Sequence, residues 1–64
     1  MVRKLEAELW EVRSTISNGI ARVLFTVQEN MMVLLHGFVK KSQKTPKEDI
    51  DLARVRKAQL KGET

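Results

Sequence analysis

An Asn-Gly dipeptide at positions 18 and 19 separates two runs of β-forming residues, and this pattern constrains the fold more than any other feature of the chain. Asparagine and glycine both tolerate positive φ, which the tight turns of β-hairpins require. We therefore expect residues 8–16 and 20–28 to pair as antiparallel strands around a turn at Ser17-Asn18-Gly19.

Side-chain alternation divides each of these strands into two sides. In the first strand, one side consists of Trp10, Val12 and Ile16, and the other of Leu9, Glu11 and Arg13. In the second strand, one side consists of Ala21, Val23, Phe25 and Val27, and the other of Ile20, Arg22, Leu24 and Thr26. Arg22 thus lies in mid-strand, on the opposite side from Phe25. Which sides combine into one face depends on the register across the turn.

A third strand is expected over residues 31–40, after a second turn at Glu29-Asn30. Connections this short cannot form crossovers, so the meander is antiparallel. Alternation in this strand separates Met31, Val33, Leu35 and Val39 from a second set, which consists of Met32, Leu34, His36, Phe38 and Lys40.

A helix start follows the third strand. Thr45 suits the N-cap, Pro46 the first helical position, and Glu48 the third position of a capping box. The helix is expected to reach about Leu60 and to end before Gly62. The predicted fold class is therefore α+β, with a three-stranded antiparallel β-meander and one C-terminal α-helix in a single domain over residues 1–64.

Composition excludes several classes of function. Without cysteine and with one histidine, the chain lacks a disulfide framework and the usual ligands of structural zinc. Its three glycines are too far apart for a phosphate-binding loop. We expect neither a metal nor a cofactor. The apolar runs are shorter than a membrane span, and charges interrupt the N-terminal residues where a signal peptide would be apolar, so a cytoplasmic location is expected.

The net charge of +4 is unevenly distributed. Residues 1–30 contain four basic and four acidic side chains, whereas residues 31–64 contain eight basic and four acidic ones. Between Lys40 and Lys47 four lysines occur without an acid. Such a patch favours a polyanion such as RNA, because lysines that replace counterions at phosphates release those ions. The alternative is a basic surface that only keeps the protein soluble.

Basic and aromatic side chains that suit RNA chemistry recur along the predicted strands, namely Arg13, Arg22, His36, Phe38, Lys40 and Lys41. Metal-free RNA cleavage needs a base for the 2′-OH, a cation for the charged transition state and an acid for the leaving oxygen. Arginine and lysine supply the cation, and a lysine packed among other cations has a lowered pKa that suits it to act as the base. Two structural alternatives remain open: Arg22 pairs with Glu11 across the hairpin, and His36 serves only packing.

Three segments carry a resemblance to a known family: L-W-E-V-R from position 9, A-R-V-L-F from position 21 and L-L-H-G-F-V-K-K-S-Q-K-T-P from position 34, the last followed by Ile50, Ala53 and Arg56. Together they resemble the RelE/ParE-like toxin superfamily, in particular its phage-associated HigB-type branch. The third segment is the most specific. The resemblance implies a truncated RelE/ParE-like fold, because the family's domain begins with a further strand and a helical hairpin for which we expect no counterpart in this chain.

The resemblance also implies a function. Members of this superfamily are toxins of toxin-antitoxin systems. The resemblance implies an mRNA endoribonuclease that inhibits translation, often at the ribosome. It also implies a cognate antitoxin, typically of helix-turn-helix type, that neutralises the toxin. The catalytic residues implied are Arg22, Lys40 and Lys41, and the RNA-binding residues implied are Arg13, His36, Phe38 and Lys44.

Loss of the helical hairpin would leave one face of the sheet exposed, with Trp10, Val12, Val23, Phe25, Met32 and Leu34 only partly covered by the helix. We therefore expect a homo-oligomer that forms through this face. The competing function is a non-catalytic interaction module that binds an antitoxin or itself. A DNA-binding role suits the charge, but no helix-turn-helix pattern supports it.

Overall fold

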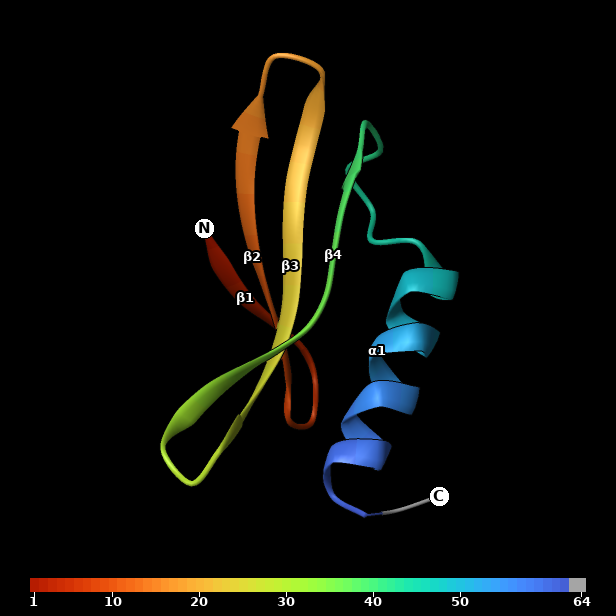
Figure 1. Ribbon diagram of the computed structural model, residues 1–64. Coiled ribbons are helices and arrows are strands. Elements are labelled where there is room, and N and C mark those ends of the chain that lie inside the picture. The colour runs from red at the N-terminus through yellow and green to blue at the C-terminus, as the bar shows by residue number, and fades with distance from the viewer. Residues whose placement is uncertain (63–64) are drawn as a thin grey trace.

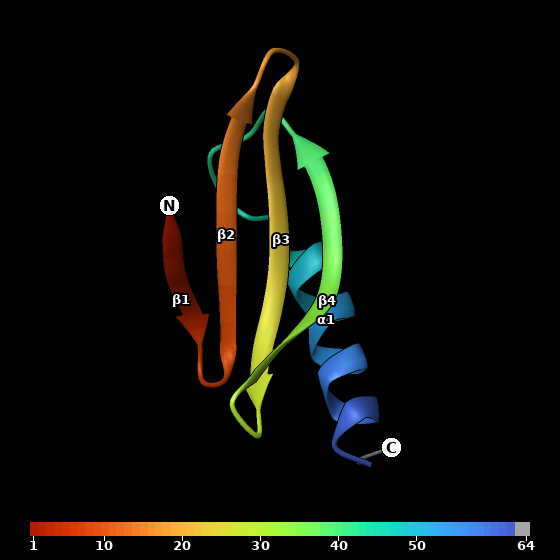
Figure 2. The ribbon, with the colours of Figure 1, turned by 60° about the vertical axis from the view of Figure 1, so that its left-hand side comes forward.

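Four strands and one helix follow one another in the computed structural model, which describes residues 1–62 (Figure 1). The strands are β1 (Val2–Glu6), β2 (Leu9–Ile16), β3 (Gly19–Gln28) and β4 (Met31–Lys40), and the helix is α1 (Lys47–Leu60). The strands form one antiparallel sheet in the order β1-β2-β3-β4 (Figure 2). Each strand therefore pairs with its neighbour in the sequence, as a meander requires.

The prediction of three strands is wrong, because β1 adds a fourth at the edge of the sheet beside β2. Three of its five residues, Arg3, Lys4 and Glu6, are charged, and an irregularity between Lys4 and Glu6 interrupts its alternation. Sequence reasoning therefore had no apolar period to detect. Charged side chains suit an edge strand, where they discourage pairing with other chains.

The two predicted hairpin turns are present, with different backbone chemistry. Ile16 pairs with Gly19, and of the Asn-Gly dipeptide only Gly19 has a positive φ, at 151°. In the second turn Glu29 and Asn30 both have positive φ, at 52° and 65°. Two such residues in succession match the twist of the flanking strands. The second turn is thus the one in which both residues take up the positive φ expected of Asn-Gly.

A bulge in β4 changes which side chains share a face. Leu24 of β3 pairs with His36 and the next residue, Phe25, pairs with Leu34, so Leu35 has no partner in the ladder. The predicted single alternation of β4 is therefore wrong. Met32 and Leu34 share a face with Phe25, whereas His36, Phe38 and Lys40 share the opposite face with Leu24.

Helix α1 packs against the face of the sheet that carries Leu24 and His36 (Figure 1). The apolar face, which carries Phe25 and Leu34, lies on the other side and is not covered by the helix. The core is small and consists of Leu9, Leu24, Leu35 and Ala53, with Leu5, Val33, Phe38 and Ile50 packed against it. The polar side chains of Glu11, Arg22 and Thr26 are buried in the same layer, between the sheet and the helix side of the molecule. The expectation that the helix would cover part of the apolar face is thus wrong, and the expectation of an exposed sheet face is confirmed at Met32 and Leu34.

The start of α1 differs from the predicted capping box. Pro46 is the N-cap, no side chain caps the helix, and Glu48 pairs with Lys40 instead. The Thr45 hydroxyl donates to the buried carboxylate of Glu11 at 2.5 Å. A buried carboxylate needs hydrogen bonds more than a helix end that solvent can reach, so Glu11 takes the hydroxyl.

Charged side chains hold the rest of α1 to the β1–β2 turn and to β4. Arg54 contacts Glu6 with Nη2 to Oε1 at 2.6 Å, and Arg56 donates to the Leu35 carbonyl at 2.8 Å. Lys57 donates to the Ala7 carbonyl at 3.1 Å. Across the described residues, no helix has the length and apolar character needed to cross a bilayer.

Candidate functional site

A histidine and an aspartate meet where β4 faces the first turn of α1. His36 Nε2 lies 2.7 Å from Asp49 Oδ1, and their side chains are only 17% and 10% exposed. The bulge in β4 turns His36 toward the helix, and the loop of residues 41–46 brings Asp49 opposite it. When Nε2 carries the proton that it donates to Asp49, Nδ1 is left as the acceptor nitrogen of the neutral ring. The pair therefore has the arrangement of a histidine base oriented by a carboxylate.

Lys40 joins this pair from the end of β4. Its Nζ lies 3.1 Å from Glu48 Oε1 and 3.2 Å from Asp49 Oδ2. Hydrogen bonds from Lys40, first to Glu48 and then to Asp49, raise the pKa of its ammonium above the usual value. The lowered lysine pKa considered in the sequence analysis is thus wrong for Lys40. This side chain is a cation that can stabilise negative charge rather than a base.

Phe38 lies between the cations of the site. Its ring stacks on His36 with centroids 5.2 Å apart, and Lys40 Nζ lies 5.9 Å from the ring centroid. The Arg22 guanidinium carbon lies 5.8 Å from the same centroid. Phe38 thus lies within reach of all three side chains, and its stacking orients the histidine ring.

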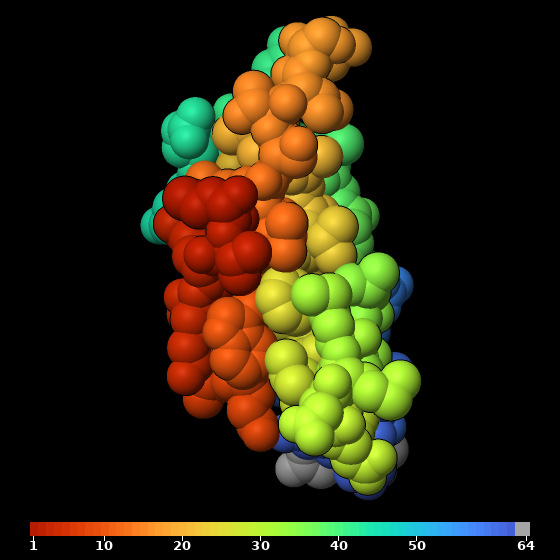
Figure 3. Space-filling view, turned by 90° about the vertical axis from the view of Figure 1, so that its left-hand side faces the viewer, coloured from red at the N-terminus to blue at the C-terminus, as the bar shows by residue number. Residues whose placement is uncertain are grey.

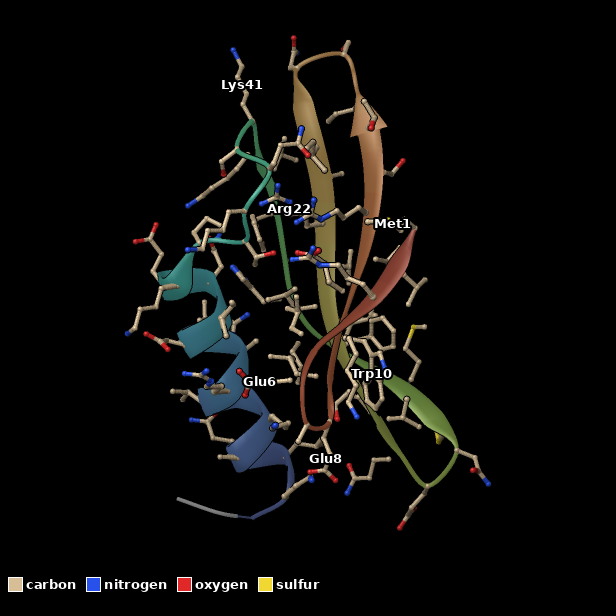
Figure 4. The ribbon with its side chains drawn as sticks, turned by 180° about the vertical axis from the view of Figure 1, so that it is seen from behind. Met1, Glu6, Glu8, Trp10, Arg22 and Lys41 are labelled. Carbon is tan, nitrogen blue, oxygen red and sulfur yellow. The ribbon has the colours of Figure 1, made fainter. Side chains whose placement is uncertain are left out.

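Arg22, the leading catalytic candidate from the sequence, is buried at 1% exposure. It donates to the Ser42 carbonyl and, at 3.2 Å, to the Lys44 carbonyl, so its guanidinium holds the loop after β4 against the sheet (Figure 4). The predicted pairing with Glu11 does not occur, since Arg22 lies opposite Arg13 in the ladder and Glu11 lies opposite Leu24. In this conformation Arg22 positions the loop and does not present its charge to a ligand.

Arg13 neutralises the buried carboxylate beside it. Its Nε lies 2.6 Å from Glu11 Oε1, and its Nη2 donates to the Gln43 carbonyl at 2.5 Å. Arg3 adds a longer contact to the same carboxylate, at 3.4 Å. Arg13 also borders a pocket, which is lined by Met1, Arg13, Thr15, Ile20 and Gln43. This pocket contains neither His36 nor Asp49.

Lys41 and Lys44 project from the loop that Arg22 holds, and both are exposed. Figure 4 shows Lys41 extending away from the sheet and from α1. Cations that are fixed at the backbone and free at the side chain suit contacts with phosphates. They lie at the same end of α1 as Lys40, so the basic surface begins at the edge of the His36 site.

The structure brings four of the predicted site residues together, namely Arg22, His36, Phe38 and Lys40. The side chains of Arg13, Lys41 and Lys44 lie outside this group, although the Lys44 carbonyl accepts a hydrogen bond from Arg22. Sequence reasoning missed Asp49, and it missed the buried pair of Glu11 and Thr45. The only sequence signal for Asp49 is its place in the first turn of a helix that follows His36 closely. Its contact with His36 depends on the bulge and on the loop path, which no local pattern encodes.

The carboxylates that attach α1 to the sheet predict a loss of stability in acid. Burial raises the pKa of Asp49, but the contacts with His36 and Lys40 outweigh burial and lower this pKa below its usual value of 3.8. The hydrogen bonds from Arg54 likewise lower the pKa of Glu6. A lowered pKa in the folded state means that the unfolded chain binds protons more readily as the pH falls. These contacts therefore stabilise the fold above about pH 4 and are lost as the pH falls through the lowered values.

We expect the thermal midpoint, followed by circular dichroism, to fall between pH 5 and pH 3, and to fall less steeply in Asp49→Asn. A wild-type midpoint that stays constant over this range would contradict the assignment, as would an unchanged slope in the variant.

A family model described as Phage derived protein Gp49-like (DUF891) matches residues 1–58. No curated protein and no solved structure matches significantly. Among residues 1–62, no group of three or more histidine, cysteine, aspartate or glutamate side chains is placed to hold a metal ion.

Proposed function

We propose that this chain, which belongs to the phage-derived Gp49-like family, is a toxin that acts by cleaving RNA. The family is linked to RelE/toxin-type proteins, which supports the toxin-like role. The observation that carries the catalytic part of the proposal is the contact between His36 and Asp49 beside the Lys40 ammonium. The finer assignment to the HigB-type branch rests on the segment from Leu34 to Pro46.

The proposed reaction is an internal transesterification, in which the 2′-OH of a ribose attacks the adjacent phosphodiester. His36 Nδ1 accepts the proton of the 2′-OH, and the 2′ oxygen forms a bond to phosphorus as the bond from phosphorus to the 5′ oxygen breaks. The leaving 5′ oxygen takes a proton from water, and the proton held by His36 returns to solvent. The products are a 2′,3′-cyclic phosphate and a 5′-OH. Asp49 holds the ring in the tautomer that this step needs, and Lys40 stabilises the charge on the phosphorane-like transition state.

The loop lysines supply the RNA-binding surface of the proposal. Lys41 and Lys44 are exposed on the loop that Arg22 fixes, so the backbone of an RNA strand that contacts them passes the edge of the His36 site. Lysine contacts to phosphates are sequence-independent. The proposed substrate is mRNA, and these two lysines should give no strong preference for its sequence. The proposed partner that neutralises the toxin is a cognate antitoxin of helix-turn-helix type.

The test uses an oligonucleotide with a single ribonucleotide in a deoxyribonucleotide strand, incubated with the protein alone in EDTA and, separately, with protein and ribosomes in a magnesium buffer. We expect cleavage after the ribonucleotide, with a 2′,3′-cyclic phosphate end identified by mass spectrometry. The all-deoxy strand, which lacks the attacking 2′-OH, should stay intact. Binding without cleavage under both conditions would favour the non-catalytic interaction module instead. Cleavage by the protein alone that occurs in magnesium and is abolished by EDTA would contradict the mechanism.

A further inference from the structure

The face of the sheet opposite α1 carries exposed apolar side chains, although Phe25 itself is buried. Figure 3 shows this side of the molecule, with the strands in front of α1. The ladder places Trp10 beside Phe25 on this face, and their rings stack with centroids 6.0 Å apart. Around them on this face lie six exposed apolar side chains, namely Val2, Ile16, Val27, Met32, Leu34 and Val39. Below, this surface is called the open face.

The area of the open face is large for so small a chain. Its most exposed side chains leave on the order of 600 Å² in contact with water, which is the upper end of the largest apolar patch that a monomer usually carries. With half-buried neighbours such as Val12 and Val23, the face approaches the roughly 800 Å² that each partner contributes to a stable interface. One face of one copy therefore supplies the area that a dimer needs.

The charge of the open face suits a second copy of the same face. Within β1 to β4, the only charged side chain on this face is Lys4, at the edge strand. Its Nζ lies 5.6 Å from the centroid of the Trp10 ring, and its position at the border leaves the ammonium in water. Two open faces in contact would thus bury no unpaired charge. Burial of an unpaired charge would oppose such a contact.

We propose that the open face is a homodimer interface, in which two copies pack sheet against sheet with Trp10 and Leu34 near the centre. Such a contact is isologous, because the same face of each copy meets its counterpart across a two-fold axis. Packed sheets lie about 10 Å apart, a distance that interdigitated side chains fill. The dimer leaves α1 and the His36 site of each copy on the two outer surfaces. It is independent of the proposed RNA cleavage, which does not use this face.

Trp10 offers a direct probe, since it is the only tryptophan of the chain and lies on the open face. Sedimentation equilibrium should give twice the monomer mass of 7.4 kDa at micromolar concentrations. Trp10 emission should shift to shorter wavelength as the protein is concentrated, because the ring leaves water. A chain that stays monomeric up to 100 µM, with emission independent of concentration, would overturn the proposal.

Two matched variants locate the interface. Leu34 in β4 and Val55 in α1 are 65% and 54% exposed, so glutamate at either site removes an exposed apolar side chain, and only Leu34 lies on the open face. Leu34→Glu should weaken dimerisation about 100-fold or more, because each copy would bury an unpaired carboxylate. Val55→Glu should leave it unchanged.

A dimer that survives Leu34→Glu would instead indicate pairing through the edge strands or binding through α1, and either result would overturn the proposal. Equal loss in both variants would do the same. Should Leu34→Glu fail to fold, Met32→Lys repeats the test at a second exposed position, and the wild-type Trp10 measurement stands without any variant.

Discussion

Replacement of His36 by glutamine is expected to lower the rate of RNA cleavage by roughly 10²-fold to 10⁴-fold, the usual contribution of a positioned acid–base group. The glutamine amide can keep a donor near the position of Nε2 and so preserve the contact with Asp49 Oδ1. It has no nitrogen that accepts a proton near neutral pH. The loss should therefore fall on kcat, and RNA affinity should stay nearly constant, because the lysines of the loop are unchanged.

Asp49→Asn tests whether the carboxylate positions the histidine. An amide can still contact His36, but it no longer favours one tautomer or balances the charge that the ring gains during proton transfer. We expect kcat to fall at least about tenfold with little change in KM. The matched control is Asp51→Asn, two residues further along α1, where the carboxylate contacts Lys47 and Arg54 and faces away from His36.

Single-turnover cleavage of the chimeric oligonucleotide, with binding measured separately by fluorescence anisotropy, separates the two effects. Full activity in His36→Gln would exclude this residue as the base. Equal losses in Asp49→Asn and Asp51→Asn would show that charge on the helix matters and that the contact with His36 does not.

Replacement of Arg22 by methionine is expected to destabilise the fold by about 2 kcal/mol, since a hydrogen bond to a charged group contributes about 1.5–3 kcal/mol. Methionine fills a similar volume, but the loop carbonyls of Ser42 and Lys44 lose their buried donor. Relief of the buried charge offsets part of this loss. For a domain with a small core, this is a large share of the total stability and corresponds to a thermal midpoint about 10 °C lower.

Urea unfolding followed by circular dichroism measures this difference, with Arg3→Met as the control. Arg3 is also an arginine of the sheet, but it is 46% exposed and makes one ion pair at 3.4 Å, so its loss should cost less than about 1 kcal/mol. A neutral effect of Arg22→Met would mean that the loop does not depend on this side chain. Lost cleavage with unchanged stability would restore the direct catalytic role that the sequence suggested for Arg22.

Local patterns in the sequence were sufficient for the elements whose signals are local. The Asn-Gly and Glu29-Asn30 turns locate both hairpins, β4 has the predicted bounds, and α1 ends at the predicted Leu60. β1 could not be recognised, because its charged residues lack an apolar period and its pairing with β2 is a tertiary contact. The capping box failed for the same kind of reason, since Glu11 competes for the Thr45 hydroxyl from more than thirty residues away.

The candidate site required information that alternation alone does not contain. Residue types pointed to a basic and aromatic group, of which His36, Phe38 and Lys40 share a face in the structure. The sequence could not show that the Arg22 guanidinium donates to loop carbonyls, because a residue of any type can supply a backbone carbonyl. Nor could it select Asp49 as the partner of His36, since that choice depends on which face of the sheet the helix covers.

The bulge at Leu35 gives one strand two opposite environments. Before it, β4 contributes Met32 and Leu34 to the open face, and after it the same strand contributes His36 and Lys40 to the other side. Point substitutions can therefore alter one surface while leaving the other intact. A one-codon deletion at Leu35 would act differently, because it would remove the bulge, leave the pairs of Leu24 with His36 and Phe25 with Leu34 in one regular ladder, and take a buried side chain out of the core. In the evolution of this strand, loss of Leu35 should therefore lower stability through the core without exchanging the two surfaces.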